Sequence, residues 1–503
     1  MTHSEGVLVL KGAHVIDPAQ GIDRVTDVTI AGGRIRSIGD APADQAAETL
    51  DLSGQHLSPG WIDIHVHVYG ALGFADPDSI GICQGVTSYI EAGGAGIDTL
   101  DECCALFENQ TTTRLYLGPL LTPFGLVGFH HQEGDPRDLG EMSIAKWLSF
   151  IEAHPGLLRY LKINAHGYGS AGSIKIGKGL GEIVGLPLYF HIGEFQDTTP
   201  EHPLADDAFR IAQSGDIITH IYHNHLGRIV DSDGTVLPVV KDAARRGVIF
   251  DIGFGGFNFD WNIAERAMGQ GIAPHIISTD LQQFNVTGPV YSLANVMSVC
   301  MRLGFSAAEI IERVTAIPAK VLSLADRAGS LRPGMPADIT VFKLERGDFT
   351  MTDTLRQTRK ADARFVPTMA FKDGKRFDCD FDRCLDERNW FMQIAEERIP
   401  PTADHLSAAQ REFLRSLAAS LSGTDWKLTS QQVDLVKARD LQDIFHRTRI
   451  QHGLAIRDGL TAVYDSFLDN KFTMQIGLFL IRLDREFALK RLNEAAGNRS
   501  IAA

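Results

Sequence analysis

Cysteine is scarce in this chain of 503 residues, which contains six of them. So few cysteines in so long a chain do not form a disulfide scaffold. Cys103 and Cys104 are adjacent, and four residues separate Cys379 from Cys384, so neither pair has the Cys-x-x-Cys spacing. This cysteine usage favours a protein of the reducing cytoplasm.

Basic residues and long apolar runs are also few. The 48 lysines and arginines are outnumbered by 63 aspartates and glutamates, which gives a formal net charge of −15. Nucleic acids and anionic membranes attract basic patches, so we expect neither as a partner. The best apolar run, IGLFLIRLDREF, is interrupted by charge, and the N-terminal MTHSEGVLVLKG lacks the basic region of a signal peptide. We expect a small-molecule substrate instead.

Hydrophobic residues make up 44% of the chain, enough for a substantial core. Short alternating runs broken by Gly, Asp and Pro in residues 1–57 predict the first part of a small β-sandwich domain. Residues 328–384 return to this pattern and are expected to complete that domain. Residues 385–503 carry apolar residues near i, i+3, i+4 and i+7, which predicts a helical extension.

Residues 58–327 have a different texture, in which short apolar runs alternate with helical stretches. About eight such units favour a (β/α)8 TIM barrel, with a doubly wound sheet as the competing topology. The predicted fold class is therefore α/β: a TIM barrel with a split β-sandwich domain and a C-terminal helical extension.

Two histidines one residue apart interrupt the apolar run GWIDIHVHVYG at residues 60–70. Alternate side chains of a strand share one face, so Asp63, His65 and His67 are expected to point the same way. Neutral imidazoles on such a face are either core residues or two ligands for one metal ion. The pair alone leaves both interpretations open.

Further candidate ligands occur in or at the ends of later strand-like runs: Lys162, His191, His220 and Asp280. Each alone has an ordinary explanation, such as a lysine that reaches solvent, a histidine bonded to a carbonyl or an aspartate that caps a helix. Together, at the mouth where barrel strands end, they predict a metal site. A bare lysine cation is costly to bury, and its carboxylation by CO2 would make it an anionic ligand.

With these residues the chain resembles the amidohydrolase superfamily of metal-dependent hydrolases. The matching segments include PGWIDIHVH at 59–67, TAIPAKVLSL at 315–324 and GSLRPGMPADITVF at 329–342. Within the superfamily it looks closest to the dihydroorotase-like binuclear branch. It is similar there to deacetylases and esterases of N-acetyl or O-acetyl carboxylic acids, through HIGEFQDTTPEH, THIYHNHLG and ISTDL.

The resemblance implies a role for each matching residue. His65, His67 and Asp280 would bind one divalent ion, and His191 and His220 would bind a second. Carboxylated Lys162 and a hydroxide would bridge the two ions, which are expected to be Zn²⁺. Asp280 would also be catalytic, accepting the proton of the attacking hydroxide and delivering it to the leaving group. Asp63 would orient a ligand histidine.

Substrate contacts are less visible in the sequence. His223 and Asn224 closely follow His220, and Arg228 has the charge to pair with a substrate carboxylate. His131, in HHQEGD, is a candidate for the mouth of the site. Each of these four also fits an ordinary solvated loop or packing residue.

We therefore predict a binuclear metal-dependent hydrolase that cleaves an amide or ester bond of a small carboxylate-bearing substrate. The alternatives are a cyclic amidohydrolase of the dihydroorotase or hydantoinase type, a mononuclear deaminase and a non-catalytic barrel scaffold. Lys162 argues against the deaminase, because a bridging lysine belongs to binuclear sites. The complete set of six competent side chains argues against the scaffold. The resemblance also favours a homo-oligomer.

Overall fold

The computed structural model describes residues 6–39, 48–73, 77–107, 111–126, 143–165, 171–193, 204–283, 285–384, 394–424, 426, 435–469 and 476–497. The chain divides into two compact units. The first comprises Met1–Tyr69 and Asp76–Leu385, and the second comprises Gly70–Ala75 and Asp386–Ala503. Strands and helices both build the first unit, which confirms the predicted α/β class, whereas helices build the second.

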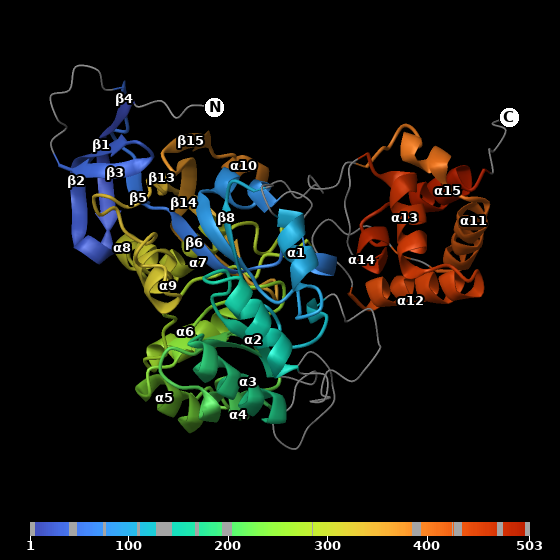
Figure 1. The fold of residues 1–503 in the computed structure, drawn as a ribbon, viewed down its shortest axis with the longest axis horizontal. Helices are drawn as coiled ribbons and strands as arrows, with labels where there is room; N and C mark the ends of the chain where they lie inside the picture. The colour runs from blue at the N-terminus through green and yellow to red at the C-terminus, as the bar shows by residue number, and fades with distance from the viewer. Residues whose placement is uncertain are drawn as a thin grey trace. The chain divides into compact units, whose positions relative to one another are not determined.

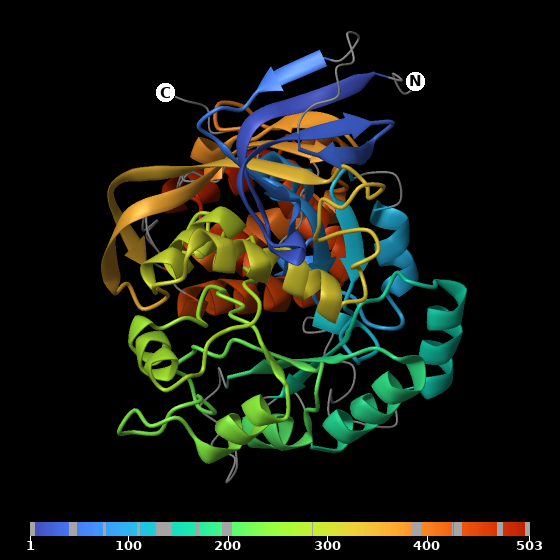
Figure 2. The same ribbon diagram turned by 90° about the vertical axis from the view of Figure 1, so that its left-hand side faces the viewer.

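One sheet of the first unit joins the two ends of that unit. Its eight strands are β1 (Val7–Asp17), β2 (Ile22–Ala31), β3 (Arg34–Ile38), β4 (Glu48–Asp51), β5 (His56–Pro59), β13 (Ile339–Thr352), β14 (Thr358–Lys372) and β15 (Lys375–Asp378). The order is β15-β14-β13-β5-β1-β2-β3, and β4 pairs with β1. Figure 2 shows the blue N-terminal and orange later strands together in this sheet. The division of these strands into a sandwich stays a prediction.

The pairing of β5 with β13 explains how segments far apart in sequence share this sheet. The two strands run antiparallel, with His56 opposite Phe342 and Pro59 opposite Ile339. Their inward side chains, among them Leu57 and Val341, are buried in one apolar cluster with residues of β1 and β2. Apolar burial of this kind is the main favourable term for joining the two segments.

Between β5 and β13 in the sequence lie shorter parallel strands. They are β6 (Trp61–Val66), β7 (Val86–Glu91), β8 (Arg114–Leu117), β9 (Leu161–Ala165), β10 (Leu188–Ile192), β11 (Ile217–Thr219) and β12 (Ile249–Phe250). β6-β7-β8 form one sheet and β9 to β12 form another, with every neighbouring pair parallel. Isolated parallel bridges connect them further: Leu117 with Leu158, Leu120 with Lys162, Asp251 with Ile276 and Val66 with Leu281. The series of parallel partners therefore leads from β6 through β12 and segment 276–281 back to β6.

Helices follow most of these strands and cover their outer side (Figure 1). They are α1 (Leu100–Phe107), α2 (Ile144–Ala153), α3 (Ala171–Val184), α4 (Leu204–Ile211), α5 (Pro238–Arg245), α6 (Trp261–Gly269), α7 (Leu293–Arg302), α8 (Ala307–Val314) and α9 (Ala316–Val321). Local sequence fixes several starts: Ser306 and Glu309 form a reciprocal capping box at α8. Because helices and the strand layer enclose β6, all six of its residues are buried.

Short helices complete the first unit, and helices also form the second. The short elements of the first unit are η1 (Pro18–Gln20), η3 (Pro77–Ser79), η4 (Ile82–Gln84) and α10 (Phe381–Cys384). The second unit contains η2 (Gly70–Leu72), η7 (Pro401–His405), α11 (Ala408–Ser422), α12 (Leu435–Gln451), α13 (Ile456–Phe467), α14 (Ile476–Leu480) and α15 (Arg485–Ala495). Its buried aromatic residues include Phe413, Phe445 and Phe467. In the described part of the chain, no helix is long and apolar enough to cross a membrane.

Candidate metal centre

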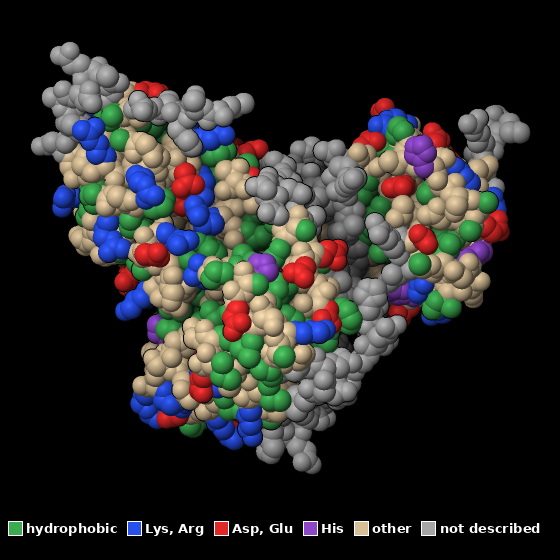
Figure 3. All heavy atoms as spheres, viewed as in Figure 1, with side chains coloured by type: hydrophobic (Ala, Val, Ile, Leu, Met, Phe, Trp, Pro, Cys, Tyr) green, Lys and Arg blue, Asp and Glu red, His purple; other side chains and the backbone are tan. Residues whose placement is uncertain are grey.

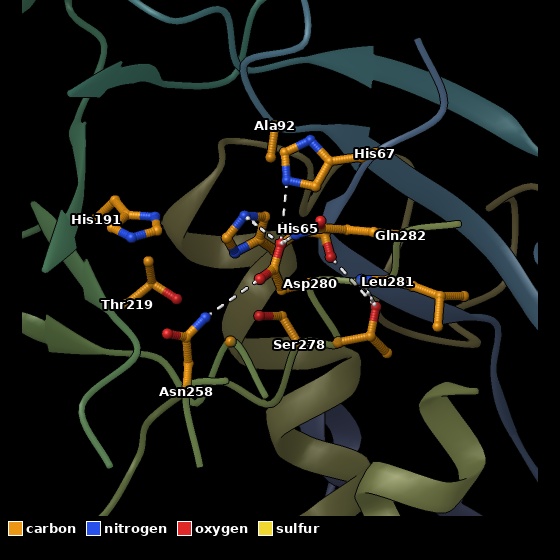
Figure 4. A network of polar contacts seen from close by, with 12 residues as sticks. His65, His67, Ala92, His191, Thr219, Asn258, Ser278, Asp280, Leu281 and Gln282 are labelled. Atoms are coloured by element: carbon orange, nitrogen blue, oxygen red, sulfur yellow. Dashed lines mark hydrogen bonds and ion pairs between the residues drawn. The ribbon is translucent and has the colours of Figure 1, made fainter. Parts of the chain in front are cut away.

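β6 and segment 276–281 bring two histidines and an aspartate together (Figure 4). The backbone amide of Asp280 donates to the His65 carbonyl (2.8 Å), and that of His67 donates to the Leu281 carbonyl (2.9 Å). This pairing places Asp280 Oδ1 3.0 Å from His67 Nε2 and 3.2 Å from His65 Nε2. All three side chains are buried, and their candidate ligand atoms lie within 4.8 Å of one another.

Lys162 joins this cluster from β9. Its Nζ lies 3.0 Å from His65 Nε2 and donates to the Ala92 carbonyl (2.8 Å). The side chain is almost completely buried, and desolvation lowers its pKa from 10.5 to about 8. A usable fraction of neutral amine is therefore present near neutral pH.

His191 on β10 and His220 at the end of β11 form the other side of the cluster. His220 Nε2 lies 3.1 Å from His191 Nδ1, and the ring centroids of His65 and His220 are 5.2 Å apart. Burial lowers the pKa of His220 to about 4, so its imidazole is neutral at pH 7. All six residues predicted as ligands thus lie in one cluster, in which five are buried and His191 is partly buried.

The outer nitrogens of three histidines face partners that direct the inner nitrogens to the cluster. His220 Nδ1 bonds the Gly253 carbonyl (2.6 Å), His65 Nδ1 bonds the Tyr189 hydroxyl (2.8 Å), and His67 Nδ1 lies 3.6 Å from Glu91 Oε1. Metal-binding histidines commonly donate their second N–H in this way. The donor set therefore fits a divalent metal ion.

The Tyr189 contact also fixes the tautomer of His65. The carboxylate of Asp251 accepts from the Tyr189 hydroxyl (2.6 Å), so the Tyr189 oxygen must accept from His65 Nδ1–H. His65 Nε2 then presents a lone pair 3.2 Å from the acceptor Oδ1 of Asp280. Two acceptors that face each other in a buried site are stabilised by a nearby cation, and Lys162 Nζ lies 3.0 Å from His65 Nε2 at this point.

Asp251 organises several side chains beneath the cluster. Its Oδ2 accepts hydrogen bonds from Tyr189 (2.6 Å), Thr219 (2.7 Å) and Ser278 (2.7 Å). Burial raises its pKa to about 6. Asp251, Tyr189 and Glu91 were not among the residues predicted for the site. An acidic residue that closes the apolar run GVIFD was the available signal for Asp251.

Asp63 supports the site through the backbone. Its Oδ1 accepts from the amides of His65 (3.2 Å) and Thr279 (3.1 Å), and its Oδ2 accepts from the Thr279 hydroxyl (2.6 Å). Asp63 thus ties β6 to segment 276–281, while the imidazole of His65 is oriented by Tyr189. Burial raises the pKa of Asp63 to about 7.

The predicted substrate residues that the structure describes lie in the loop after β11. His223 is buried, and its Nδ1 accepts the His225 amide (3.0 Å), so the neutral ring carries its proton on Nε2. Burial lowers its pKa, and Arg228 adds a smaller effect in the same direction. Asn224 and Arg228 are partly exposed. His131 lies outside the described residues.

Two buried amides contact opposite oxygens of Asp280. Gln282 Nε2 donates to Oδ1 (2.8 Å), and Asn258 Nδ2 lies 3.5 Å from Oδ2. Neither was predicted as a site residue, although the segment GFGGFNF at 253–259 was expected to give either close substrate approach or a simple turn. The carboxylate is therefore held from two sides by neutral donors.

Comparisons with known proteins found relatives of this chain. The model of the amidohydrolase family matches residues 258–377. A deacetylase of Agrobacterium fabrum is 30% identical over 355 residues, which cover 69% of this chain and 85% of the relative. A deacetylase of Enterococcus faecalis is 30% identical over 362 residues, which cover 70% of this chain and 95% of the relative. A dihydroorotase of Streptococcus pneumoniae is 24% identical, covering 72% and 95%.

Solved structures show the same relationship. A crystal structure of an adenine deaminase has 28% sequence identity and a TM-score of 0.67, covering 74% of this chain and 99% of its own. A dihydroorotase structure has 26% identity and a TM-score of 0.66, covering 75% and 98%.

Proposed function

This chain belongs to the amidohydrolase family of hydrolases that act on C–N bonds, and we propose that it is a binuclear metal-dependent enzyme that removes an acyl group from a small carboxylate-bearing substrate. The cluster of His65, His67 and Asp280 beside a buried Lys162 is the observation that carries the proposal. The deacetylase names of two relatives support an acetyl group as the acyl group.

We infer a (β/α)8 barrel for residues 58–327, with the strands of 1–57 and 328–384 as its accessory β-domain. The support is the series of parallel partners from β6 through β12 and segment 276–281 back to β6. Active sites of such barrels lie at the carboxyl ends of the strands. His65, His191 and His220 stand at or next to those ends.

His65, His67 and Asp280 would hold one divalent ion, and His191 and His220 would hold a second. Lys162, carboxylated by CO2, would contact both, and its pKa of about 8 provides the neutral amine which that reaction needs. Zinc suits the imidazole-rich set. When bound, the ions would supply an activated water and polarise the acyl carbonyl.

Asp280 would take the proton of the attacking water and give it to the leaving atom. Burial acts to raise the pKa of Asp280, but the hydrogen bond with His67 and the nearby histidine and lysine charges hold it below the ordinary value. The carboxylate is therefore ionised and ready to accept a proton. We expect Asp280→Asn to retain the fold and to lose almost all turnover.

The substrate carboxylate is proposed to meet the loop after β11. Arg228 supplies a cation there, and neutral His223 carries an Nε2–H donor. Acidic and basic side chains are interspersed on the face of each unit seen in Figure 3. This mixture supports a small molecule rather than nucleic acid or a membrane as partner. The cytoplasmic location, the homo-oligomer and the roles of Asn224 and His131 stay predictions.

Two other activities are favoured by particular comparisons. The dihydroorotase relatives favour hydrolysis of a cyclic amide, and the adenine deaminase structure favours a deaminase. A panel of N-acetyl acids, O-acetyl acids, cyclic ureides and adenine separates these activities. Membership of a family of hydrolases leaves the non-catalytic scaffold without support.

The decisive test is metal content per chain after expression with zinc and bicarbonate. We expect about two ions in the parent protein, from the two ligand groups, and fewer in Lys162→Ala. Lys178→Ala is the matched control, because Lys178 is a partly buried lysine of α3 whose Nζ lies 2.8 Å from Asp216 Oδ2. One ion per chain in the parent would favour the mononuclear deaminase, and equal metal content in the two variants would remove Lys162 from the site.

A further inference from the structure

The turn after β12 places a buried amide beside Asp280. Asn258 is 2% exposed, and its Nδ2 lies 3.5 Å from Asp280 Oδ2. A carboxylate only accepts hydrogen bonds, so the amide must face Asp280 with its NH2 group and direct its carbonyl elsewhere. Figure 4 shows this orientation, with the Asn258 oxygen pointing away from Asp280 on the side of Thr219 and His191.

The carbonyl oxygen of Asn258 is buried and has no hydrogen-bond partner among the described residues. A buried acceptor left without a donor is costly, and such atoms in native proteins need an explanation. Here the atom belongs to the side chain that contacts the oxygen of Asp280 on the side away from His65 and His67. It therefore lies next to the position from which Asp280 must protonate the leaving atom.

The local backbone is built to allow this approach. Gly255 has φ of +58°, and a Cβ at this residue would lie 2.6 Å from both Asn258 Nδ2 and Asp280 Oδ2. Any side chain there would separate the two groups. The turn itself is held by the stacked rings of Phe254 and Phe259, whose centroids are 4.6 Å apart. Asn258 is thus presented by a turn that is packed against neighbouring rings and that leaves its side chain buried.

We propose that Asn258 selects secondary amides: its NH2 group holds Asp280 Oδ2, and its carbonyl oxygen accepts the N–H of the scissile amide. This inference rests on the proposed hydrolase function and adds the class of bond. In the reaction, water oxygen forms a bond to the acyl carbon, and its proton passes to Asp280. The C–N bond then breaks as Asp280 returns that proton to nitrogen.

The hydrogen bond to Asn258 would orient nitrogen for this last step. As the acyl carbon becomes tetrahedral, a lone pair develops on nitrogen. Because the N–H bond is directed at Asn258, this lone pair is free to face Asp280 Oδ2. An ester oxygen has no hydrogen to offer, and an N-methyl amide carries a methyl group in its place. Both leave the Asn258 carbonyl without a donor, so the site discriminates against them.

Three matched acids test the proposal: N-acetylglycine, N-acetylsarcosine and O-acetylglycolate. They differ only in presenting N–H, N–CH3 or O at the scissile bond. For the zinc-loaded parent we expect kcat/KM on N-acetylglycine to exceed that on N-acetylsarcosine by about 10- to 100-fold, the effect of one unpaired buried group. In Asn258→Ala this ratio should fall towards one, with the largest loss on N-acetylglycine.

Gln282→Ala is the matched control, because Gln282 is a buried amide on the opposite oxygen of the same carboxylate. It should lower the rates on all reactive substrates by a similar factor and keep the ratio between them. Thermal unfolding and metal content of both variants check that fold and metal binding are retained. A selective loss in Gln282→Ala, or an unchanged ratio in Asn258→Ala, would overturn the assignment to Asn258.

Binding to the metal-free protein gives a readout that does not depend on turnover. By calorimetry, the parent should bind N-acetylglycine more tightly than N-acetylsarcosine, and Asn258→Ala should bind both alike. If the parent hydrolyses none of the three acids, the proposed function fails and this binding comparison alone decides the role of Asn258. Equal affinities in the parent would reject that role. If the parent hydrolyses these acids and Asn258→Ala lowers the rates on all of them equally, the role of Asn258 is rejected while the hydrolase proposal stands.

Discussion

Removal of the Tyr189 hydroxyl tests whether Tyr189 and Asp251, which lie behind His65, control metal binding. In Tyr189→Phe, His65 Nδ1–H loses its acceptor, and Asp251 loses one of its three hydroxyl donors. His65 is completely buried, so water does not replace the lost bond. A buried donor left unpaired costs about 1–3 kcal/mol, and loss of such a partner weakens metal affinity by about 10- to 100-fold. We expect both effects in Tyr189→Phe.

Tyr160→Phe is the control that separates metal binding from stability. Tyr160 stacks on Tyr189 with ring centroids 4.4 Å apart, and its hydroxyl donates to the Ile64 carbonyl (2.8 Å) instead of a histidine ring. Urea unfolding of the metal-free proteins should show a similar loss of stability in the two variants. Zinc competition against a chelator should show weaker affinity in Tyr189→Phe alone. Equal zinc affinity in the two variants would refute the reasoning.

Three further predictions concern stability away from the cluster. Lys372 and Asp338 form a buried ion pair, so Lys372→Met should cost about 3–5 kcal/mol of unfolding free energy, and adding Asp338→Asn should recover part of it in a double-mutant cycle. His275 Nδ1 accepts a hydrogen bond from the Phe250 amide, and burial lowers the pKa of His275, so protonation of this ring favours the unfolded state. The free energy of unfolding should therefore fall as the pH drops below about 6.5. Urea titrations at pH 7 and pH 5 should show a smaller fall in His275→Gln. Gly179 lies within α3 with open space at its Cβ position, so Gly179→Ala should raise stability by about 0.5–1 kcal/mol, and a destabilised variant would contradict the open site.

Local sequence pattern was sufficient to predict the six clustered side chains. The alternation around His65 and His67 gave a shared face, because side chains of a strand alternate in direction. Lys162 and Asp280 could be added because polar residues in apolar strand-like runs are unusual. The helices α11 to α15 lie within the predicted helical extension, and that expectation came from apolar spacing, which depends only on neighbouring residues.

How these groups are held depends on contacts between residues far apart in sequence. Tyr189 meets His65 across 124 positions of sequence, and Asn258 meets Asp280 through a turn that requires Gly255. Asp63 accepts from the backbone amide of His65 and from both the amide and the hydroxyl of Thr279, so it ties two segments together, and its expected role in orienting a histidine stays a prediction. Such contacts depend on which strands lie side by side and on side-chain directions in three dimensions. Local sequence thus sets which groups are available for chemistry, whereas long-range packing sets their tautomers, their protonation and the direction in which each one acts.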